Sequence, residues 1–275
     1  MRVAFLGPAG TFTEEALRAS ATGPVEEVPY PTVYETVMAV ETGDVDRAVV
    51  PIENSLEGSV NATLDALAGE AAAVRIAAEV VRPVRHCLIA RGVLGLEAVR
   101  RVLSHPQATA QCDRFLHERM PAAERVGVGS TAEAVRVVAE SPEPWAALGS
   151  RLAAELYGCE LLAEGVEDRP ENRTRFVWLA PASAGWPTEA SKTSVVFWGF
   201  NDESPGALVD VLREIADRGI NLTKIESRPR RMGLGHYMFF ADLAGGVHEE
   251  AVAQAVEALR GRVEALRVLG SYPAT

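Results

Sequence analysis

Short apolar runs alternate with segments of helical periodicity through the first part of the chain. The runs that we predict as strands cover residues 3–6, 25–30, 48–52, 99–103, 125–128 and 146–148. The segments that we predict as helices cover residues 13–19, 59–67, 107–119, 131–139 and 151–157, with one more beginning near Thr32. Strands that alternate with helices are typical of a parallel sheet, so we expect an α/β fold.

A long β-rich run over residues 76–90 crosses Pro83 and separates two such series. We therefore expect a first domain over residues 1–180 with two α/β lobes joined by crossing strands. Residues 1–80 and 162–180 would form one lobe and residues 81–161 the other. Because ligands of open sheets bind outside the carboxyl ends of the strands, we expect the binding site in a cleft between the lobes.

Residues 181–191 break the alternation with turn formers and small polar residues, which predicts a linker. Beyond it we predict strands at residues 194–199, 222–227, 236–243 and 265–269, with helices at residues 206–218 and 249–259. The order is βαββαβ. Residues 192–275 are therefore expected to form a second, ferredoxin-like domain.

Composition narrows the class of protein. The chain has 275 residues, 48% of them hydrophobic, which is enough for two domain cores. No run approaches the roughly 18 apolar residues of a membrane helix, and the N-terminus reads as a strand, so a cytoplasmic protein without a membrane partner is expected. The net charge of -11 disfavours a nucleic-acid partner. A local arginine or a helix N-terminus could still hold a small anion.

Several kinds of chemistry lack the residues they need. The sequence has no His or Cys cluster with metal spacing and no Gly-x-Ser-x-Gly motif. Lys192 and Lys224 are the only lysines, and both lie outside the first domain, which excludes Schiff-base chemistry there. Cys87, Cys112 and Cys159 are far apart and are expected to be small buried apolar side chains.

Polar loops follow the predicted strands of the first domain. Gly7-Pro8-Ala9-Gly10-Thr11-Phe12-Thr13 leads into a helix for which Thr13 is a candidate cap. Pro51-Ile52-Glu53-Asn54-Ser55 places a carboxylate, an amide and a hydroxyl after another strand. Ser104-His105-Pro106-Gln107 and Ser130-Thr131 occupy the same position after two further strands. A capping turn or a structural histidine explains each loop alone, but their recurrence favours a shared site.

Asn172-Arg173-Thr174-Arg175-Phe176 leads into a predicted strand over residues 176–179. Side chains alternate along a strand, so Arg173 and Arg175 share one face and Thr174 points to the other. Two readings stay open from the residues alone: an active-site segment, or an exposed basic edge that discourages strand addition.

Taken together, these loops resemble the prephenate dehydratase family, and the resemblance extends over nearly the whole chain. The motifs that carry it are Gly7-Pro8-x-Gly10-Thr11-Phe12, Pro51-Ile52-Glu53-Asn54-Ser55 with Gly58, His105-Pro106-Gln107, Ser130-Thr131-Ala132 and Asn172-x-Thr174-Arg175-Phe176. The resemblance implies a two-lobed catalytic domain like the periplasmic binding proteins. It also implies a lyase that removes water and carbon dioxide from prephenate, giving phenylpyruvate for phenylalanine biosynthesis, without a cofactor or a metal.

The resemblance assigns roles to individual residues. Thr174 is the implied catalytic hydroxyl, which donates a hydrogen bond or a proton to the leaving group; hydrogen bonding is the safer role because a threonine is a very weak acid. Glu53 and His105 are implied to support the site. The implied substrate contacts are Thr11, Asn54, Ser55, Gln107, Ser130, Thr131, Asn172, Arg175 and Phe176.

The second domain resembles an ACT regulatory domain. Gly206-Ala207-Leu208-Val209 and Glu226-Ser227-Arg228-Pro229 carry this resemblance. It implies feedback inhibition by phenylalanine, bound between paired ACT domains and hence in a homodimer or homotetramer. The residues implied to bind phenylalanine are Gly206, Ala207, Leu208, Val209, Asn221, Leu222, Glu226, Ser227, Arg228 and Pro229.

Two alternative functions remain at this stage. Arogenate differs from prephenate by an amino group in place of a keto group, so an arogenate dehydratase would need few different contacts. A two-lobed anion-binding sensor would use the same cleft without chemistry, although the segment around Thr174 favours catalysis.

Overall fold

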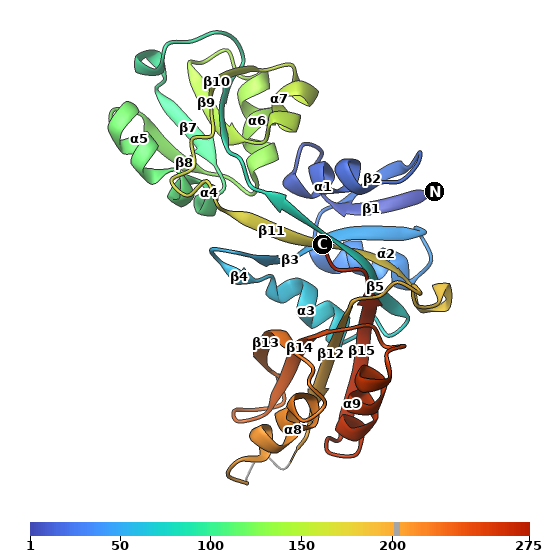
Figure 1. Ribbon diagram of the computed structural model, residues 1–275. Coiled ribbons are helices and arrows are strands. Elements are labelled where there is room, and N and C mark those ends of the chain that lie inside the picture. Colours follow the sequence, from blue (N-terminus) through green and yellow to red (C-terminus); the bar gives the residue numbers. More distant parts are fainter. Residues whose placement is uncertain (201–203) are drawn as a thin grey trace. The chain divides into compact units, whose positions relative to one another are not determined.

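The computed structural model describes residues 1–200 and 204–275, which divide into two compact units (Figure 1). The first unit comprises Met1–Thr36, Val49–Val60 and Val81–Phe176. The second comprises Val37–Ala48, Asn61–Val80 and Val177–Thr275. The elements that contribute residues to both units are α2 (Val33–Glu41), β3 (Arg47–Asn54), β5 (Val74–Pro83) and β11 (Arg173–Pro181).

The N-terminal part of the first unit is a parallel β-α-β arrangement. β1 (Arg2–Leu6) and β2 (Glu26–Tyr30) pair in parallel and are connected by α1 (Phe12–Ser20). β4 (Gly58–Ser59) turns back on the end of β3, so that Asn54 pairs with Gly58. Gly58 has φ +81°, which favours glycine at this tight turn. The turn holds the polar residues that follow β3 in a fixed place.

The other part of the first unit is a five-stranded sheet with the order β10-β6-β9-β7-β8. Its strands are β6 (Cys87–Ala90), β7 (Arg101–Ser104), β8 (Glu124–Gly127), β9 (Trp145–Gly149) and β10 (Glu160–Glu164). β7 is parallel to β8 and β9, whereas β6 is antiparallel to β9 and β10. The expected parallel sheet is thus only partly parallel.

Helices cover both faces of this sheet, and residue alternation along the strands fills two cores. The helices are α4 (Pro106–Gln111), α5 (Asp113–Arg119), α6 (Thr131–Glu140) and α7 (Arg151–Tyr157), with a 3-10 turn over Leu96–Ala98. Cys87 and Ile89 face the core under α6 and α7, whereas Leu88 faces the core under α5. Strands buried on both faces read as continuous apolar runs, as these do.

The C-terminal part of the second unit has the predicted βαββαβ order. Its elements are β12 (Lys192–Trp198), α8 (Ala207–Ala216), β13 (Leu222–Pro229), β14 (Tyr237–Ala244), α9 (Glu250–Arg260) and β15 (Ala265–Tyr272). The strand order is β13-β14-β12-β15, and β15 also pairs with β5 through Gly270 and Ile76.

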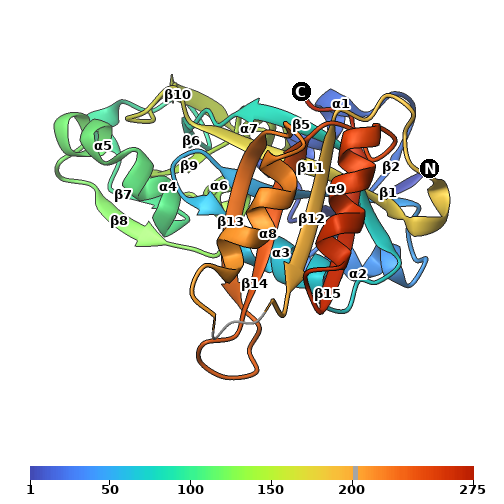
Figure 2. The ribbon, with the colours of Figure 1, turned by 60° about the horizontal axis from the view of Figure 1, so that its bottom comes forward.

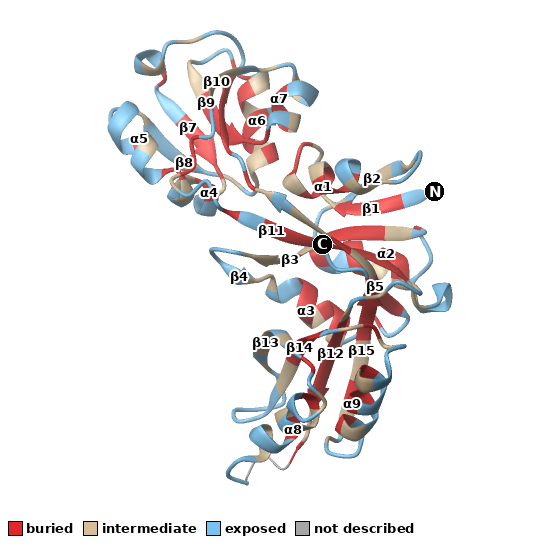
Figure 3. Cartoon of the chain, viewed as in Figure 1, coloured by how far each residue is buried: buried red, intermediate tan, exposed pale blue. Residues whose placement is uncertain are grey.

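The two helices of this domain lie side by side on one face of its sheet (Figure 2). Phe197 of β12, Val211 of α8 and Val256 of α9 belong to the core that they enclose. Buried residues run along β12 and β15 (Figure 3). The second unit also contains α3 (Asn61–Ala68) and a 3-10 turn over Ala182–Ala184. Among the helices of the described residues, none is long and apolar enough to cross a membrane.

Three sequence-based expectations are wrong in detail. The helix expected over residues 107–119 is two helices that meet at Cys112, whose backbone (φ -118°, ψ 19°) leaves the helical region. The cap of α1 is Thr11 instead of Thr13, because the Thr11 hydroxyl lies where it accepts from the Glu14 N–H. Cys159 is only partly buried. The β-rich run expected over residues 76–90 is confirmed and consists of two strands, β5 and β6.

Candidate active site

A cavity of about 360 Å³ opens in the first unit where several strands end. Its lining comes from the segments that follow β1, β3, β7 and β8 and from the start of β11. The predicted site residues that line it are Asn54, His105, Gln107, Ser130, Thr131 and Thr174. With Phe12 from the segment after β1, the structure thus brings together all five segments that the sequence singled out.

The start of α6 supplies the part of the cavity best suited to an anion. Ser130 caps this helix, and its hydroxyl accepts from the Glu133 N–H at 3.0 Å. The Glu133 carboxylate in turn accepts from the Gly129 N–H at 3.0 Å. Free N–H groups at a helix N-terminus carry a partial positive charge, so the Ser130–Thr131 end favours a carboxylate in the cavity.

His105 has a defined structural role at the start of α4. Its Nδ1 accepts from the Gln107 N–H at 3.3 Å, and Pro106 occupies the first helical turn. Because Nδ1 is the acceptor, a neutral His105 carries its proton on Nε2. His105 and Gln107 both line the cavity, so the cap also positions the Gln107 side chain at its edge.

Thr174 is a buried residue of β11 that lines the cavity, 8% exposed. Its Oγ1 lies 2.9 Å from Asn54 Nδ2. An amide NH₂ can only donate, so Thr174 is the acceptor in this bond and its own hydroxyl hydrogen is free for another acceptor. The Asn54 side chain is itself fixed, since its Oδ1 accepts from the N–H groups of Leu56 and Glu57 at 2.9 and 3.0 Å.

The two arginines beside Thr174 differ in burial. Arg173 is exposed, whereas Arg175 is 8% exposed and forms an ion pair with Glu53 at 3.1 Å. The expected basic edge is therefore wrong for Arg175, whose charge a carboxylate neutralises. Phe176 is 2% exposed and belongs to the interior. Arg175, Glu53 and Phe176 are not part of the cavity lining as we define it.

Three other predicted site residues form hydrogen bonds with neighbouring parts of the chain. The Thr11 hydroxyl donates to the Leu6 carbonyl at 2.9 Å. The Ser55 hydroxyl accepts from the Arg173 N–H at 2.9 Å. Asn172 is 1% exposed, and its Oδ1 accepts from Asn54 Nδ2 at 2.9 Å. Their positions support the loops that carry the cavity, and their roles as substrate contacts stay predictions.

Two polar residues of the cavity were not singled out from the sequence. His86 and Gln111 both line it, and His86 Nε2 lies 3.1 Å from Gln111 Oε1. The phenyl ring of Phe12 stands edge-on to the imidazole with the ring centres 5.3 Å apart. Burial lowers the pKa of His86 from its ordinary value, which favours the neutral ring. The sequence did hold one indication for Gln111, because it lies one helical turn beyond Gln107 and so on the same helix face.

The segments expected to bind phenylalanine lie in the second unit. Gly206, with φ +88°, precedes α8, and Gly206, Ala207, Leu208 and Val209 line a cavity of about 310 Å³. Asn221 and Leu222 lie at the start of β13, and Asn221 accepts from the Ala244 N–H at 2.9 Å. Glu226 is half-buried and Ser227 is exposed on the same strand.

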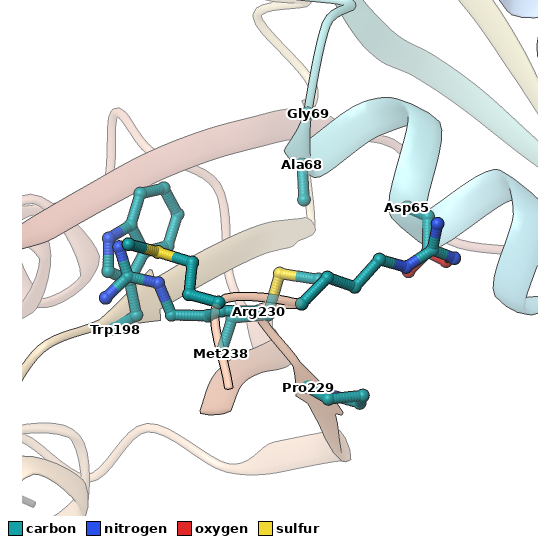
Figure 4. A pocket seen from close by; sticks show the side chains of 9 residues that line it. Asp65, Ala68, Gly69, Trp198, Pro229, Arg230 and Met238 are labelled. Atoms are coloured by element: carbon teal, nitrogen blue, oxygen red, sulfur yellow. The ribbon is translucent and has the colours of Figure 1, made fainter. Parts of the chain in front are cut away.

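The end of β13 borders a different cavity, of about 290 Å³ (Figure 4). Pro229, Arg230 and Trp198 contribute to its lining, together with Asp65 of α3. Arg228 forms a bidentate ion pair with Asp65, with the nearest atoms 2.7 Å apart. The two segments therefore line separate cavities of one chain, and a shared effector site stays a prediction that involves a second copy.

The fold and the cavity define an α/β domain with a polar site at its strand ends, followed by a regulatory-type βαββαβ domain. The chain belongs to the prephenate dehydratase family: residues 3–184 match the family model described as prephenate dehydratase, and residues 196–261 match the ACT domain. This confirms the expected family and the expected enzyme class.

Full-length relatives agree with this assignment. A prephenate dehydratase from Mycolicibacterium vanbaalenii is 43% identical over 98% of this chain and 90% of its own length. The crystal structure of a prephenate dehydratase from Arthrobacter aurescens in complex with L-Phe has a TM-score of 0.91, with 38% identity over 100% of this chain and 90% of that chain. This similarity confirms the expected α/β fold with a C-terminal ACT domain.

One similar structure has a different description. GqqA, described as a novel type of quorum quenching acylase, has a TM-score of 0.87 and 32% identity over 100% of this chain and 98% of that chain. The same fold therefore occurs in a protein with another described activity, and the choice of reaction depends on the site.

Proposed function

We propose that this chain catalyses the decarboxylating dehydration of prephenate to phenylpyruvate. The observation that carries the proposal is the Thr174 hydroxyl. It lines the cavity, accepts a hydrogen bond from Asn54 at 2.9 Å and keeps its own hydrogen available. A donor held in place before the reaction stabilises the charge that develops on a departing oxygen.

The cavity suits each part of prephenate. Its two carboxylates would lie towards the N-terminus of α6 at Ser130 and Thr131, where free N–H groups favour anions. The ring hydroxyl would lie at Thr174. The ring carbon–oxygen bond breaks as the ring carboxylate leaves as carbon dioxide and its bonding electrons complete the aromatic ring. The departing hydroxide takes up a proton and becomes water.

Apolar residues form part of the cavity wall and would pack against the ring of the substrate. Leu6, Phe12, Val60 and Val84 are among them. Holding the ring here orients the scissile carboxylate relative to the hydroxyl, which is the positioning that this reaction requires. No cofactor is needed for this chemistry, because aromatisation supplies much of the driving force.

The first test measures phenylpyruvate released from prephenate in buffer that contains a chelator. Thr174→Ala should lower kcat by about 10² to 10³, comparable with the loss of one transition-state donor, with a smaller change in KM. Thr174→Ser keeps the hydroxyl and is the matched control, expected to retain most of the activity. Equal kcat values for the Ala and Ser variants would refute the role of Thr174.

Arogenate is the alternative substrate to compare with prephenate. The keto group of prephenate and the amino group of arogenate lie on the same side chain of the substrate, so both molecules would fit the ring and hydroxyl contacts. The ratio of kcat/KM for the two substrates decides which one the site prefers. We propose prephenate as the substrate because the relatives from Mycolicibacterium vanbaalenii and Arthrobacter aurescens are described as prephenate dehydratases.

Among the described residues, Thr174 has no base hydrogen-bonded to it that would make it the nucleophile of an acylase. Amide hydrolysis needs a nucleophile or water activated by a base. The described partner of the Thr174 hydroxyl is the Asn54 amide, which cannot accept a proton. The same preparation is assayed for amine release from N-acyl amides. Hydrolysis of these amides without phenylpyruvate formation from prephenate would favour the acylase function.

We further propose that phenylalanine inhibits the enzyme through paired ACT domains and that the protein is a cytoplasmic homo-oligomer. The glycine at the start of α8 and the cavity beside it support an effector site. Light scattering of the purified protein gives the oligomeric state. Phenylalanine titration of the dehydratase activity should give inhibition that Gly206→Ala weakens, because φ +88° strains any residue with a Cβ.

A further inference from the structure

A chain of side-chain hydrogen bonds connects Thr174 to His86. Asn54 Nδ2 lies 2.9 Å from both Thr174 Oγ1 and Asn172 Oδ1. Asn172 Nδ2 lies 3.1 Å from Gln111 Oε1, and the same oxygen lies 3.1 Å from His86 Nε2. Four of these five residues come from different segments of the first unit: the end of β3, the turn before β11, the end of α4 and the start of β6.

Groups at both ends fix the direction of every bond in this chain. Asn54 Oδ1 accepts from two backbone N–H groups, so its Nδ2 must be the donor towards Asn172. Gln111 Nε2 lies 3.4 Å from the Glu57 carboxylate, which can only accept, so Gln111 Oε1 is the acceptor at the other end. Asn172 then has one consistent orientation, with its oxygen towards Asn54 and its nitrogen towards Gln111.

This direction determines the tautomer of His86. Because Gln111 Oε1 accepts, His86 must donate from Nε2, and a neutral imidazole then has a bare lone pair on Nδ1. Nδ1 has no hydrogen-bond partner among the described residues, although the side chain is only 2% exposed. A buried acceptor without a partner is unfavourable, and such groups are often kept for a ligand.

His86 and Thr174 line the same cavity. The prephenate dianion has two carboxylates and a keto group that accept, and one hydroxyl on its ring that donates. An acceptor on the His86 side chain, which lines this cavity, would match one group of the substrate. That group is the same hydroxyl that departs in the reaction.

We infer that His86 Nδ1 accepts a hydrogen bond from the ring hydroxyl of prephenate and so orients it. This inference rests on the proposed function. With its hydrogen directed to His86, the hydroxyl presents an oxygen lone pair to Thr174, whose hydroxyl donates. The chain through Asn54, Asn172 and Gln111 holds both partners in complementary roles, one as donor and one as acceptor.

Two substitutions separate this role from a structural one. In His86→Asn the amide oxygen occupies the place of Nδ1, so the acceptor is kept and the bond to Gln111 is lost. In His86→Gln the amide nitrogen occupies the place of Nε2, so the bond to Gln111 is kept and the acceptor is lost. We expect His86→Gln to lower kcat/KM for prephenate by on the order of ten- to a hundredfold, and His86→Asn to recover most of it.

Phenylpyruvate provides a second readout, because it has no ring hydroxyl. As a competitive inhibitor it should bind His86→Gln and the unsubstituted enzyme with the same inhibition constant. An equal loss for prephenate and phenylpyruvate, or a His86→Asn variant no better than His86→Gln, would overturn the inference and assign His86 to packing. If the unsubstituted enzyme forms no phenylpyruvate at all, the proposed function fails instead.

Discussion

Asn54→Asp is the substitution that best tests the directed network. The two side chains have the same shape, and the aspartate oxygen that replaces Oδ1 can still accept from the N–H groups of Leu56 and Glu57. The other oxygen replaces a nitrogen that donates towards Thr174, Asn172 and the Arg173 carbonyl at 2.9, 2.9 and 3.3 Å. A donor is thus exchanged for a charged acceptor that faces three oxygens.

The Thr174 hydroxyl resolves its part of this conflict by rotating to donate to the new carboxylate. Its hydrogen is then no longer available to the departing oxygen of the substrate. The loss corresponds to one transition-state donor, about 3 to 4 kcal/mol, or a kcat lower by about 10² to 10³. The oxygens of Asn172 and Arg173 stay opposite the carboxylate without a hydrogen between them, so stability should fall by about 1 to 3 kcal/mol.

The assay follows phenylpyruvate release under saturating prephenate, with urea unfolding measured on the same preparation. Asn61→Asp is the matched control, because Asn61 is an exposed residue at the start of α3 and the same change in charge should leave kcat unaltered there. The reasoning is refuted by an Asn54→Asp enzyme that is folded and retains a kcat within about threefold of the unsubstituted protein.

Three further predictions concern other parts of the structure. Asp65→Ala should lower the free energy of unfolding of the second unit by about 1.5 to 3 kcal/mol, because its partner Arg228 is mostly buried. Arg231→Ala should lower it by under about 1 kcal/mol, since Arg231 is 76% exposed. Urea unfolding measures both values. Gly10→Ala should lower the melting temperature, because φ +91° disfavours alanine and its Cβ would meet a neighbouring side chain at 2.9 Å. Burial raises the pKa of the Cys87 thiol to about 11, so at pH 8 alkylation should be slow in the folded protein and fast in urea, which peptide mass spectrometry would detect.

The sequence was sufficient for features that depend on neighbouring residues. Apolar runs and helical periodicity predicted the βαββαβ order of the second domain, and α7 was expected at the bounds that it has, Arg151–Tyr157. Strand alternation separated Thr174 from Arg173 and Arg175, and the cavity lining includes Thr174 but neither arginine. Local periodicity determines which face of an element is buried, so these features can be read along the chain.

Local patterns were least reliable at the ends and breaks of elements. Thr11 and Thr13 both fit a helix cap, and only the backbone geometry shows that Thr11 accepts from Glu14. The break at Cys112 has no proline or glycine beside it in the sequence. Arg175 could be either an exposed charge or a paired one, and its partner Glu53 lies on another strand.

The contact between Asn54 and Thr174 shows what tertiary structure alone decides. Strand-end loops marked both residues from the sequence, but the hydrogen bond between them joins positions 120 apart. His86 and Gln111 were not singled out because an imidazole on a strand and an amide on a helix have many ordinary explanations. A hydrogen bond has a direction only when donor and acceptor face each other in space, so the tautomer of His86 and the free hydrogen of Thr174 follow from the folded protein.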